Sequence, residues 1–157
     1  MENEVGPNFF IAGAPKAGTT SLYHNLRQHP QVYMSPVKEP CYFASEIRVE
    51  NFAPEMQPKM RAQMERVKAR IGHGLVDNKT RGIVAEWAEY IRLFEGVKEE
   101  TAAGEASVCY LWSRTAPAAM MPAFIPSMPN PLREWVWKCL SRLSVANPSS
   151  KSQLSSV

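Results

Sequence analysis

A glycine-rich segment near the N-terminus, Gly13 to Thr20 (GAPKAGTT), contains residue types that could bind an anion. Gly13 and Gly18 have the G-x-x-x-x-G spacing of a Walker A loop, but Thr19 stands where that loop carries its lysine. The lysine, Lys16, lies inside the loop instead. Backbone N–H groups of such a loop, together with the N-terminus of the helix that follows, converge on a phosphate or a similar anion. The segment therefore predicts an anion-binding loop in which Lys16 meets a group that enters or leaves at the mouth of the loop.

The displaced lysine disfavours ordinary ATP or GTP hydrolysis. In P-loop NTPases the lysine that opens the helix reaches the β- and γ-phosphates, and a Walker B aspartate helps to hold Mg²⁺. This chain has a single aspartate, Asp77, and it lies in a segment rich in Lys, Arg and Gly rather than after an apolar strand. A P-loop nucleotide-binding protein or small kinase that uses Lys16 in a different way stays open as an alternative.

Three segments resemble the motifs of sulfotransferases that use 3′-phosphoadenosine 5′-phosphosulfate (PAPS). Pro15–Leu22 (PKAGTTSL) resembles the motif that binds the 5′-phosphosulfate. Tyr33–Phe43 (YMSPVKEPCYF) resembles the K-E-P-x-x-F segment of the heparan-sulfate and carbohydrate branch, and Gly104–Leu111 (GEASVCYL) is similar to a looser G-E-x-S/T-P-x-Y segment. The three occur in the expected order and cover roughly residues 8–118.

The resemblance implies transfer of a sulfonate group from PAPS to a hydroxyl or amine of a carbohydrate-like acceptor, with no metal. PAPS would be bound through backbone N–H groups and hydroxyls, and Lys16 would stabilise charge on the bridging oxygen as its bond to sulfur breaks. The donor-binding residues implied are the loop lysine and the five residues after it: Lys16, Ala17, Gly18, Thr19, Thr20 and Ser21.

The acceptor hydroxyl must lose a proton, so the site needs a base. The resemblance assigns that role to Glu39, and it assigns to Lys38 a contact with the substrate or with the donor sulfonate. The alternative is that Lys38 and Glu39 form a solvated pair in a loop. Glu105 and Ser107 match the third segment, but we leave them outside the predicted site because Ala106 departs from the family's usual choice there.

The elements that must position these residues alternate between strand and helix. This alternation predicts an α/β fold, a P-loop NTPase-like parallel sheet flanked by helices and incomplete on its C-terminal side. Strands are expected at Asn8–Ala14, Gln31–Ser35 and Ala103–Leu111, the last running into a loop, and helices at Thr19–His29, Pro54–Ile71 and Ile83–Phe94.

The C-terminal part of the chain does not follow the resemblance. The family holds the 3′-phosphate with an apolar strand, an Arg and a later Ser, whereas residues 120–131 contain four prolines, which a central strand cannot accommodate. We therefore expect residues 1–118 to be the N-terminal part of a sulfotransferase domain, apparently truncated. Residues 119–157 are expected to be a divergent Pro- and Ser-rich tail with a short amphipathic helix near residues 132–143. This arrangement predicts weak donor binding, and a non-catalytic fragment that acts through a basic tail is a further alternative.

Composition limits the remaining possibilities. The formal net charge of +3 is too small to indicate nucleic-acid binding, and the excess lies in the tail: Arg114 to Val157 has five basic residues and one acidic residue. No apolar run approaches the ~20 residues of a membrane span, and no secretory signal is visible. We expect a cytoplasmic protein, or a Golgi protein if an anchor has been lost. The three cysteines lack CxxC spacing and are expected to be reduced, with no zinc site.

Overall fold

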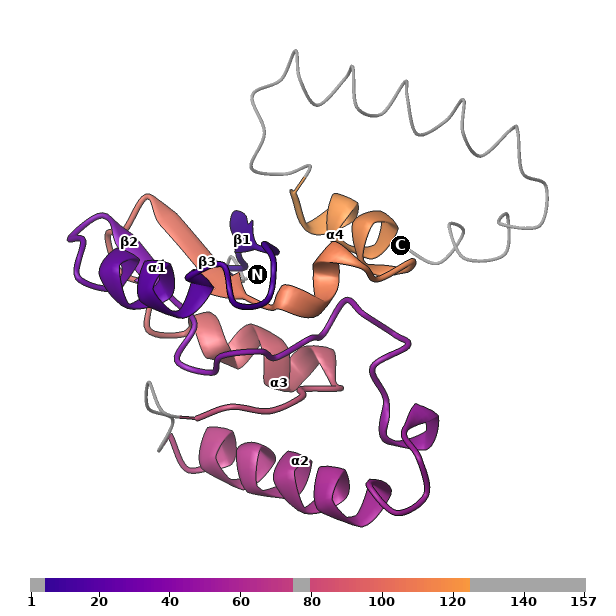
Figure 1. The fold of residues 1–157 in the computed structure, drawn as a ribbon. Helices are drawn as coiled ribbons and strands as arrows, with labels where there is room; N and C mark the ends of the chain where they lie inside the picture. Colours follow the sequence, from indigo (N-terminus) through magenta and orange to yellow (C-terminus); the bar gives the residue numbers. More distant parts are fainter. Residues whose placement is uncertain (1–4, 75–79, 125–157) are drawn as a thin grey trace. The chain divides into compact units, whose positions relative to one another are not determined.

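The computed structural model describes residues 5–74 and 80–124 (Figure 1). With the exception of Phe124, these residues belong to a single compact unit, Met1–Ala123. The helix expected near residues 132–143 lies outside the described residues. The domain boundary expected after residue 118 stays a prediction, and helix α4 (Ala116–Phe124) runs across it.

The unit is built on a three-stranded parallel sheet. Its strands are β1 (Phe9–Ile11), β2 (Val32–Met34) and β3 (Ala102–Ala106), and β3 lies between the other two. Because the strands are parallel, all three carboxyl ends meet at one edge of the sheet. The loops that follow the strands carry the three segments singled out in the sequence, so this topology brings the three segments to the same edge. The predicted α/β fold with a parallel sheet is confirmed.

Alternation of side chains along the strands produces an apolar core on each face of the sheet, as is typical of parallel sheets. Ile11, Met34 and Ala106 point to one face, where they pack with Tyr23 of helix α1 (Thr19–Leu26). The neighbouring strand residues point to the other face. There they meet a larger core that contains most of the buried aromatic rings, among them Phe43, Tyr90, Phe94 and Tyr110.

Helix α1 follows the glycine-rich loop, as the sequence predicts. It ends at Leu26, four residues before Pro30. The Tyr23 hydroxyl donates a hydrogen bond to the Ser35 carbonyl oxygen (2.8 Å) and is completely buried. This bond ties the helix after β1 to the chain just after β2, so the first two motif-bearing segments are held in a fixed relation.

The second half of the unit holds the remaining helices. Their bounds are α2 (Gln57–Gly72) and α3 (Trp87–Ile91), with short 3-10 helices at Val49–Asn51, Arg92–Phe94 and Val108–Leu111. The prediction of a helix from Ile83 is wrong for its first four residues, which are not helical. The chain there runs beside the K-E-P segment: Lys38 pairs with Arg81, and the Val84 N–H donates to the Pro40 carbonyl oxygen (2.9 Å). Backbone pairing has overridden the helical spacing of the apolar residues.

Candidate functional site

The glycine-rich loop leaves the carboxyl end of β1 and is open to solvent. Gly18 has φ of 82°, a left-handed conformation that glycine adopts without a steric penalty, and the helix begins at the next residue. No side chain caps the start of α1, and its first turn has no acidic residue. Such a turn presents backbone N–H groups and the positive end of the helix dipole to an incoming anion. The Ala17 N–H is already used within the loop, where it donates to the Ala14 carbonyl oxygen (3.2 Å).

The side chains predicted to hold the donor lie on this loop and first turn. Lys16, Thr20 and Ser21 are exposed, and Thr19 is half-buried. Lys16 also has a left-handed backbone, with φ of 64°, which is costly for a residue with a Cβ. Strained backbone of this kind concentrates at functional sites, where the surrounding structure holds it in place. The loop therefore presents hydroxyls, N–H groups and one cation to solvent.

The K-E-P segment lies beside the end of β3. The Glu39 N–H donates to the Ala106 carbonyl oxygen (2.9 Å), and the Lys38 N–H donates to the Thr80 carbonyl oxygen (3.0 Å). Glu39 has φ of 61°, a second strained position. These backbone bonds fix the segment between β3 and the chain near residue 80, so Glu39 is held next to the third motif.

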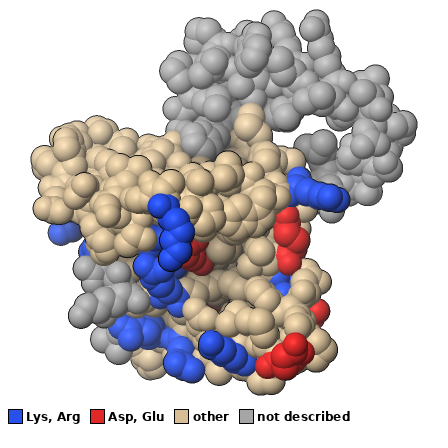
Figure 2. Space-filling view, viewed as in Figure 1, with Lys and Arg blue, Asp and Glu red and all other residues tan. Residues whose placement is uncertain are grey.

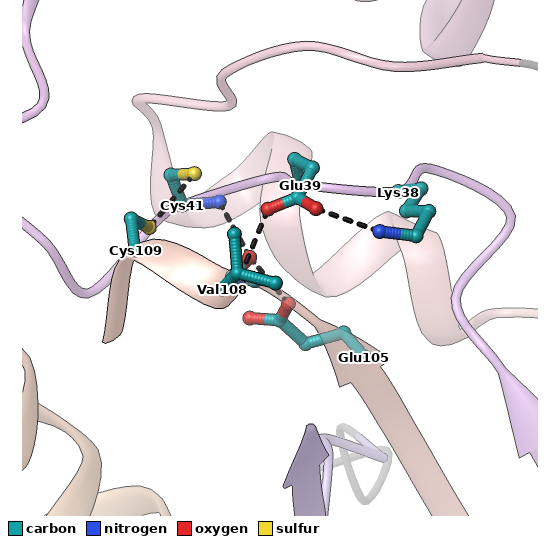
Figure 3. Close-up of polar contacts among 7 residues, drawn as sticks. Lys38, Glu39, Cys41, Glu105, Val108 and Cys109 are labelled. Atoms are coloured by element: carbon teal, nitrogen blue, oxygen red, sulfur yellow. Dashed lines mark hydrogen bonds and ion pairs between the residues drawn. The ribbon is translucent and has the colours of Figure 1, made fainter. Parts of the chain in front are cut away.

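Both oxygens of the Glu39 carboxylate have partners (Figure 3). Oε1 accepts from the Lys38 ammonium at 2.6 Å, and Oε2 accepts from the Val108 N–H at 2.9 Å. The Lys38 side chain is 3% exposed and that of Glu39 is 24% exposed. Glu39 can therefore be reached from solvent, whereas Lys38 is buried and faces Glu39. In this arrangement Lys38 positions the carboxylate, and its predicted contact with a substrate stays a prediction.

A second carboxyl group, that of Glu105 on β3, lies near Glu39 in the interior of the unit. It is completely buried and accepts hydrogen bonds from three hydroxyls, those of Ser107 (2.7 Å), Tyr110 (2.5 Å) and Tyr90 (3.3 Å). Burial is the main cause that raises the pKa of Glu105 to about 7; the nearby charge of Glu39 adds to this rise, and the hydrogen bonds from the three hydroxyls oppose it. Glu105 therefore keeps its proton to a higher pH than an exposed glutamate does.

Ser107 links the buried carboxyl group of Glu105 to the segment that carries Glu39. Its hydroxyl donates to Glu105 and accepts from the Cys41 N–H (3.0 Å), and its own N–H donates to the Ile11 carbonyl oxygen (3.2 Å). Glu105 and Ser107 therefore organise the edge where all three segments meet, although we left them outside the predicted site. A signal was present in the sequence: a glutamate within the short apolar segment AAGEASV must be hydrogen-bonded if it is buried.

One face of the molecule carries side chains of both charges. Figure 2 shows Lys and Arg side chains gathered in a line down one side of this face, with acidic atoms beside them. Among residues 5–74 and 80–124, no group of three or more His, Cys, Asp or Glu side chains is placed to hold a metal ion. Within the same described ranges, no helix is long and apolar enough to cross a membrane.

Comparison with known proteins finds clear sequence similarity over a short part of the chain. No family model matches the chain. Carbohydrate sulfotransferase 15 of Homo sapiens, and that of Rattus norvegicus, are 59% identical to the chain over 37 residues, which is 24% of this chain and 7% of each relative. The chain thus matches only a small fraction of the length of these curated relatives.

Similarity to a solved structure extends further along the chain. A crystal structure of a sulfotransferase from Alicyclobacillus acidocaldarius is 33% identical, with a TM-score of 0.56, over 76% of this chain and 41% of that chain. The sequence similarity and the structural similarity identify the same family, as do the three segments at the edge of the sheet. These similarities support the assignment of the chain to the sulfotransferase family.

Proposed function

We propose that this chain carries the 5′-phosphosulfate-binding part of a PAPS-dependent sulfotransferase, which transfers a sulfonate group to a hydroxyl or amine of a carbohydrate-like acceptor. One observation carries the proposal. The glycine-rich loop, the Lys38–Glu39 pair and the end of β3 lie at one edge of the parallel sheet, connected by the Ser107–Ile11, Glu39–Ala106 and Val108–Glu39 hydrogen bonds. Ligands of open α/β sheets bind outside the carboxyl ends of the strands, and this is that edge.

The loop and the first turn of α1 supply the donor site. N–H groups of Gly18, Thr19 and Thr20 and the hydroxyls of Thr19, Thr20 and Ser21 bind the 5′-phosphosulfate oxygens. PAPS supplies the sulfonate and the leaving phosphate when it is bound. The exposed ammonium of Lys16 neutralises the negative charge that grows on the oxygen between phosphorus and sulfur.

Glu39 is the proposed base. Its carboxylate is fixed by Lys38 and by the Val108 N–H, so its orientation does not depend on the acceptor. A quarter of its side chain is exposed, which leaves room for an acceptor hydroxyl to approach. A base must lie within hydrogen-bond reach of the proton that it accepts, and the partly exposed Glu39 carboxylate meets that requirement for an acceptor that enters from solvent.

The donor site is proposed to be one-sided, which means that it binds the 5′-phosphosulfate of PAPS and makes little contact with the 3′-phosphate. Residues 8–118 resemble the 5′-phosphosulfate part of the family, whereas residues 119–157 do not resemble the part that binds the 3′-phosphate. We therefore expect the chain to bind PAPS weakly, with little contribution from the 3′-phosphate. We place the protein in the cytoplasm, with the Golgi as the alternative location.

Binding of two donors tests this assignment. Calorimetry is done with PAPS and with adenosine 5′-phosphosulfate, which lacks the 3′-phosphate. The two are expected to bind with Kd values within a few-fold of each other, and Lys16→Ala should weaken both by about 10-fold or more because a charge-assisted contact to the anion is lost. Lys59→Ala, which removes an exposed lysine of α2, is the matched control and should bind like the wild type. A PAPS affinity far above that of adenosine 5′-phosphosulfate would refute the one-sided site.

Transfer itself is tested with labelled PAPS and a panel of glycans. The expected result is transfer to at least one glycan by the wild type and its loss in Lys16→Ala and Glu39→Gln. Glu99→Gln, at an exposed position, serves as the control for loss of a carboxylate. Near-normal turnover by Glu39→Gln would refute the role of Glu39 as the base. A wild-type chain that binds the donor but transfers nothing would restrict the chain to donor binding, and Mg²⁺-dependent ATP turnover would favour the nucleotide-binding alternative.

A further inference from the structure

Two cysteines from distant parts of the chain face each other next to the site. Cys41 follows Pro40 in the K-E-P segment, and Cys109 lies in the 3-10 helix Val108–Leu111 after β3. Both are 6% exposed and neither is bonded to another cysteine. Their Sγ atoms are 3.0 Å apart (Figure 3). A disulfide bond is about 2.05 Å long, so the two sulfur atoms need to approach by only about 1 Å.

The backbone on both sides of this pair is already fixed. On one side the Cys41 N–H donates to the Ser107 hydroxyl (3.0 Å), and the Val108 N–H donates to Glu39 (2.9 Å). On the other, the Phe43 N–H donates to the Tyr110 hydroxyl (3.4 Å). Hydrogen bonds thus join the same two segments on both sides of the cysteine pair. The two cysteines are therefore held close to each other by contacts that do not involve their sulfur atoms.

We propose that Cys41 and Cys109 are a redox pair that forms a reversible disulfide with a low-molecular-weight disulfide, such as oxidised glutathione, as the oxidant. One thiolate attacks the small disulfide and releases one equivalent of its thiol. The second protein thiol then displaces the other half, so that one S–S bond forms in the protein. The two cysteines lose two electrons and two protons, and the small disulfide is reduced to two thiols.

The surroundings determine how fast this exchange proceeds. The Cys109 thiol and burial raise the pKa of Cys41 well above its ordinary value, so the attacking thiolate is scarce in the folded protein. Exchange therefore proceeds during folding or through local opening of the K-E-P segment. Once formed, the bond is shielded from reductants by the same burial.

The bond would link the two segments that hold Glu39. Cys41 lies two residues after Glu39, and Cys109 directly follows Val108, whose N–H binds the Glu39 carboxylate. The closed loop would also contain α2, α3 and β3. Because a cross-link over so long a loop restricts the unfolded chain, the oxidised protein should melt about 10 °C above the reduced protein.

The test measures free thiols in the full-length chain. The protein is refolded from denaturant in glutathione buffers that range from fully reduced to fully oxidised, quenched with acid, alkylated in denaturant and weighed by mass spectrometry. We expect three alkylated cysteines at the reduced end and one at the oxidised end, with a Cys41–Cys109 cross-linked peptide on digestion. Cys109→Ser should give two alkylated cysteines in every buffer. Cys139→Ser, the matched control, removes the third cysteine and should give two at the reduced end and none at the oxidised end.

Three results would overturn the proposal: three alkylated cysteines at the oxidised end, glutathione attached to Cys41 or Cys109 without a cross-link, or a cross-link through Cys139. Thermal melting of the wild type and of Cys139→Ser in both buffers gives a second readout that does not require the pair to be mutated. A melting temperature that is the same in both buffers, in a protein shown to be cross-linked, would refute the predicted stabilisation. None of these readouts depends on sulfotransferase activity.

Discussion

Replacing Glu105 with glutamine removes a buried ionisable group and keeps its size and much of its hydrogen bonding. The carboxyl group of Glu105 is completely buried and surrounded by the hydroxyls of Ser107, Tyr90 and Tyr110. These hydroxyls can rotate to accept from an amide as well as donate to it. The variant should therefore fold, and it should differ from the wild type in how its stability depends on pH.

The sign of the effect follows from the direction of the pKa shift. The pKa of Glu105 is raised from 4.5 to about 7 in the folded protein, so between these values the folded state binds more protons than the unfolded state. Stability from this group is complete below pH 4.5 and is lost as the pH rises through 7. A shift of about 2.5 pKa units corresponds to about 3 kcal/mol in total, of which about 2.5 kcal/mol falls between pH 5 and pH 8.

The assay is urea unfolding of the wild type and of Glu105→Gln at pH 5, 6, 7 and 8, followed by circular dichroism. The free energy of unfolding of the variant, relative to that of the wild type, should rise by about 2–3 kcal/mol from pH 5 to pH 8. The matched control is Glu99→Gln, in which the carboxyl group lost is exposed. A difference between the wild type and Glu105→Gln that stays constant within about 0.5 kcal/mol over this range would refute the raised pKa.

Two further predictions concern the stability of the fold. A Cβ at Gly104 would lie 2.4 Å from the Phe9 ring, so Gly104→Ala should lower the free energy of unfolding by about 1–3 kcal/mol, measured by urea denaturation. Gly6→Ala, whose Cβ would make an ordinary 3.5 Å contact, should change it by less than about 0.5 kcal/mol, and equal effects would contradict the predicted clash. A hydrogen bond from the Thr115 hydroxyl lowers the pKa of Glu46 from 4.5 to about 2, so this group loses its stabilising effect as the pH falls through that range. Between pH 5 and pH 2.5, Glu46→Gln should therefore lose less stability than the wild type, and parallel losses would exclude the lowered pKa.

The elements of the fold could largely be predicted from the chain itself. The apolar residues before Gly13, the glycine-rich loop and the helix after it follow local rules of spacing and capping, and the structure has each of them. The stripe of apolar residues from Met56 to Ile71 likewise forms α2. The segment from Ile83 did not follow its local pattern, because its backbone pairs with the K-E-P segment, and pairing between distant segments leaves no periodic signal.

For the candidate site, too, some features could be predicted from the sequence and others could not. The sequence by itself determined which residues can bind an anion or accept a proton, since Lys16, the hydroxyls after Gly18 and Glu39 are recognised by type and spacing. Only the tertiary structure decided their environments. It buries Lys38 against Glu39 and encloses Glu105 among three hydroxyls, because burial and hydrogen-bond partners come from segments up to 69 residues away, as in the Val108–Glu39 bond. The same long-range packing brings Cys41 to Cys109, a contact that no local pattern in the sequence specifies.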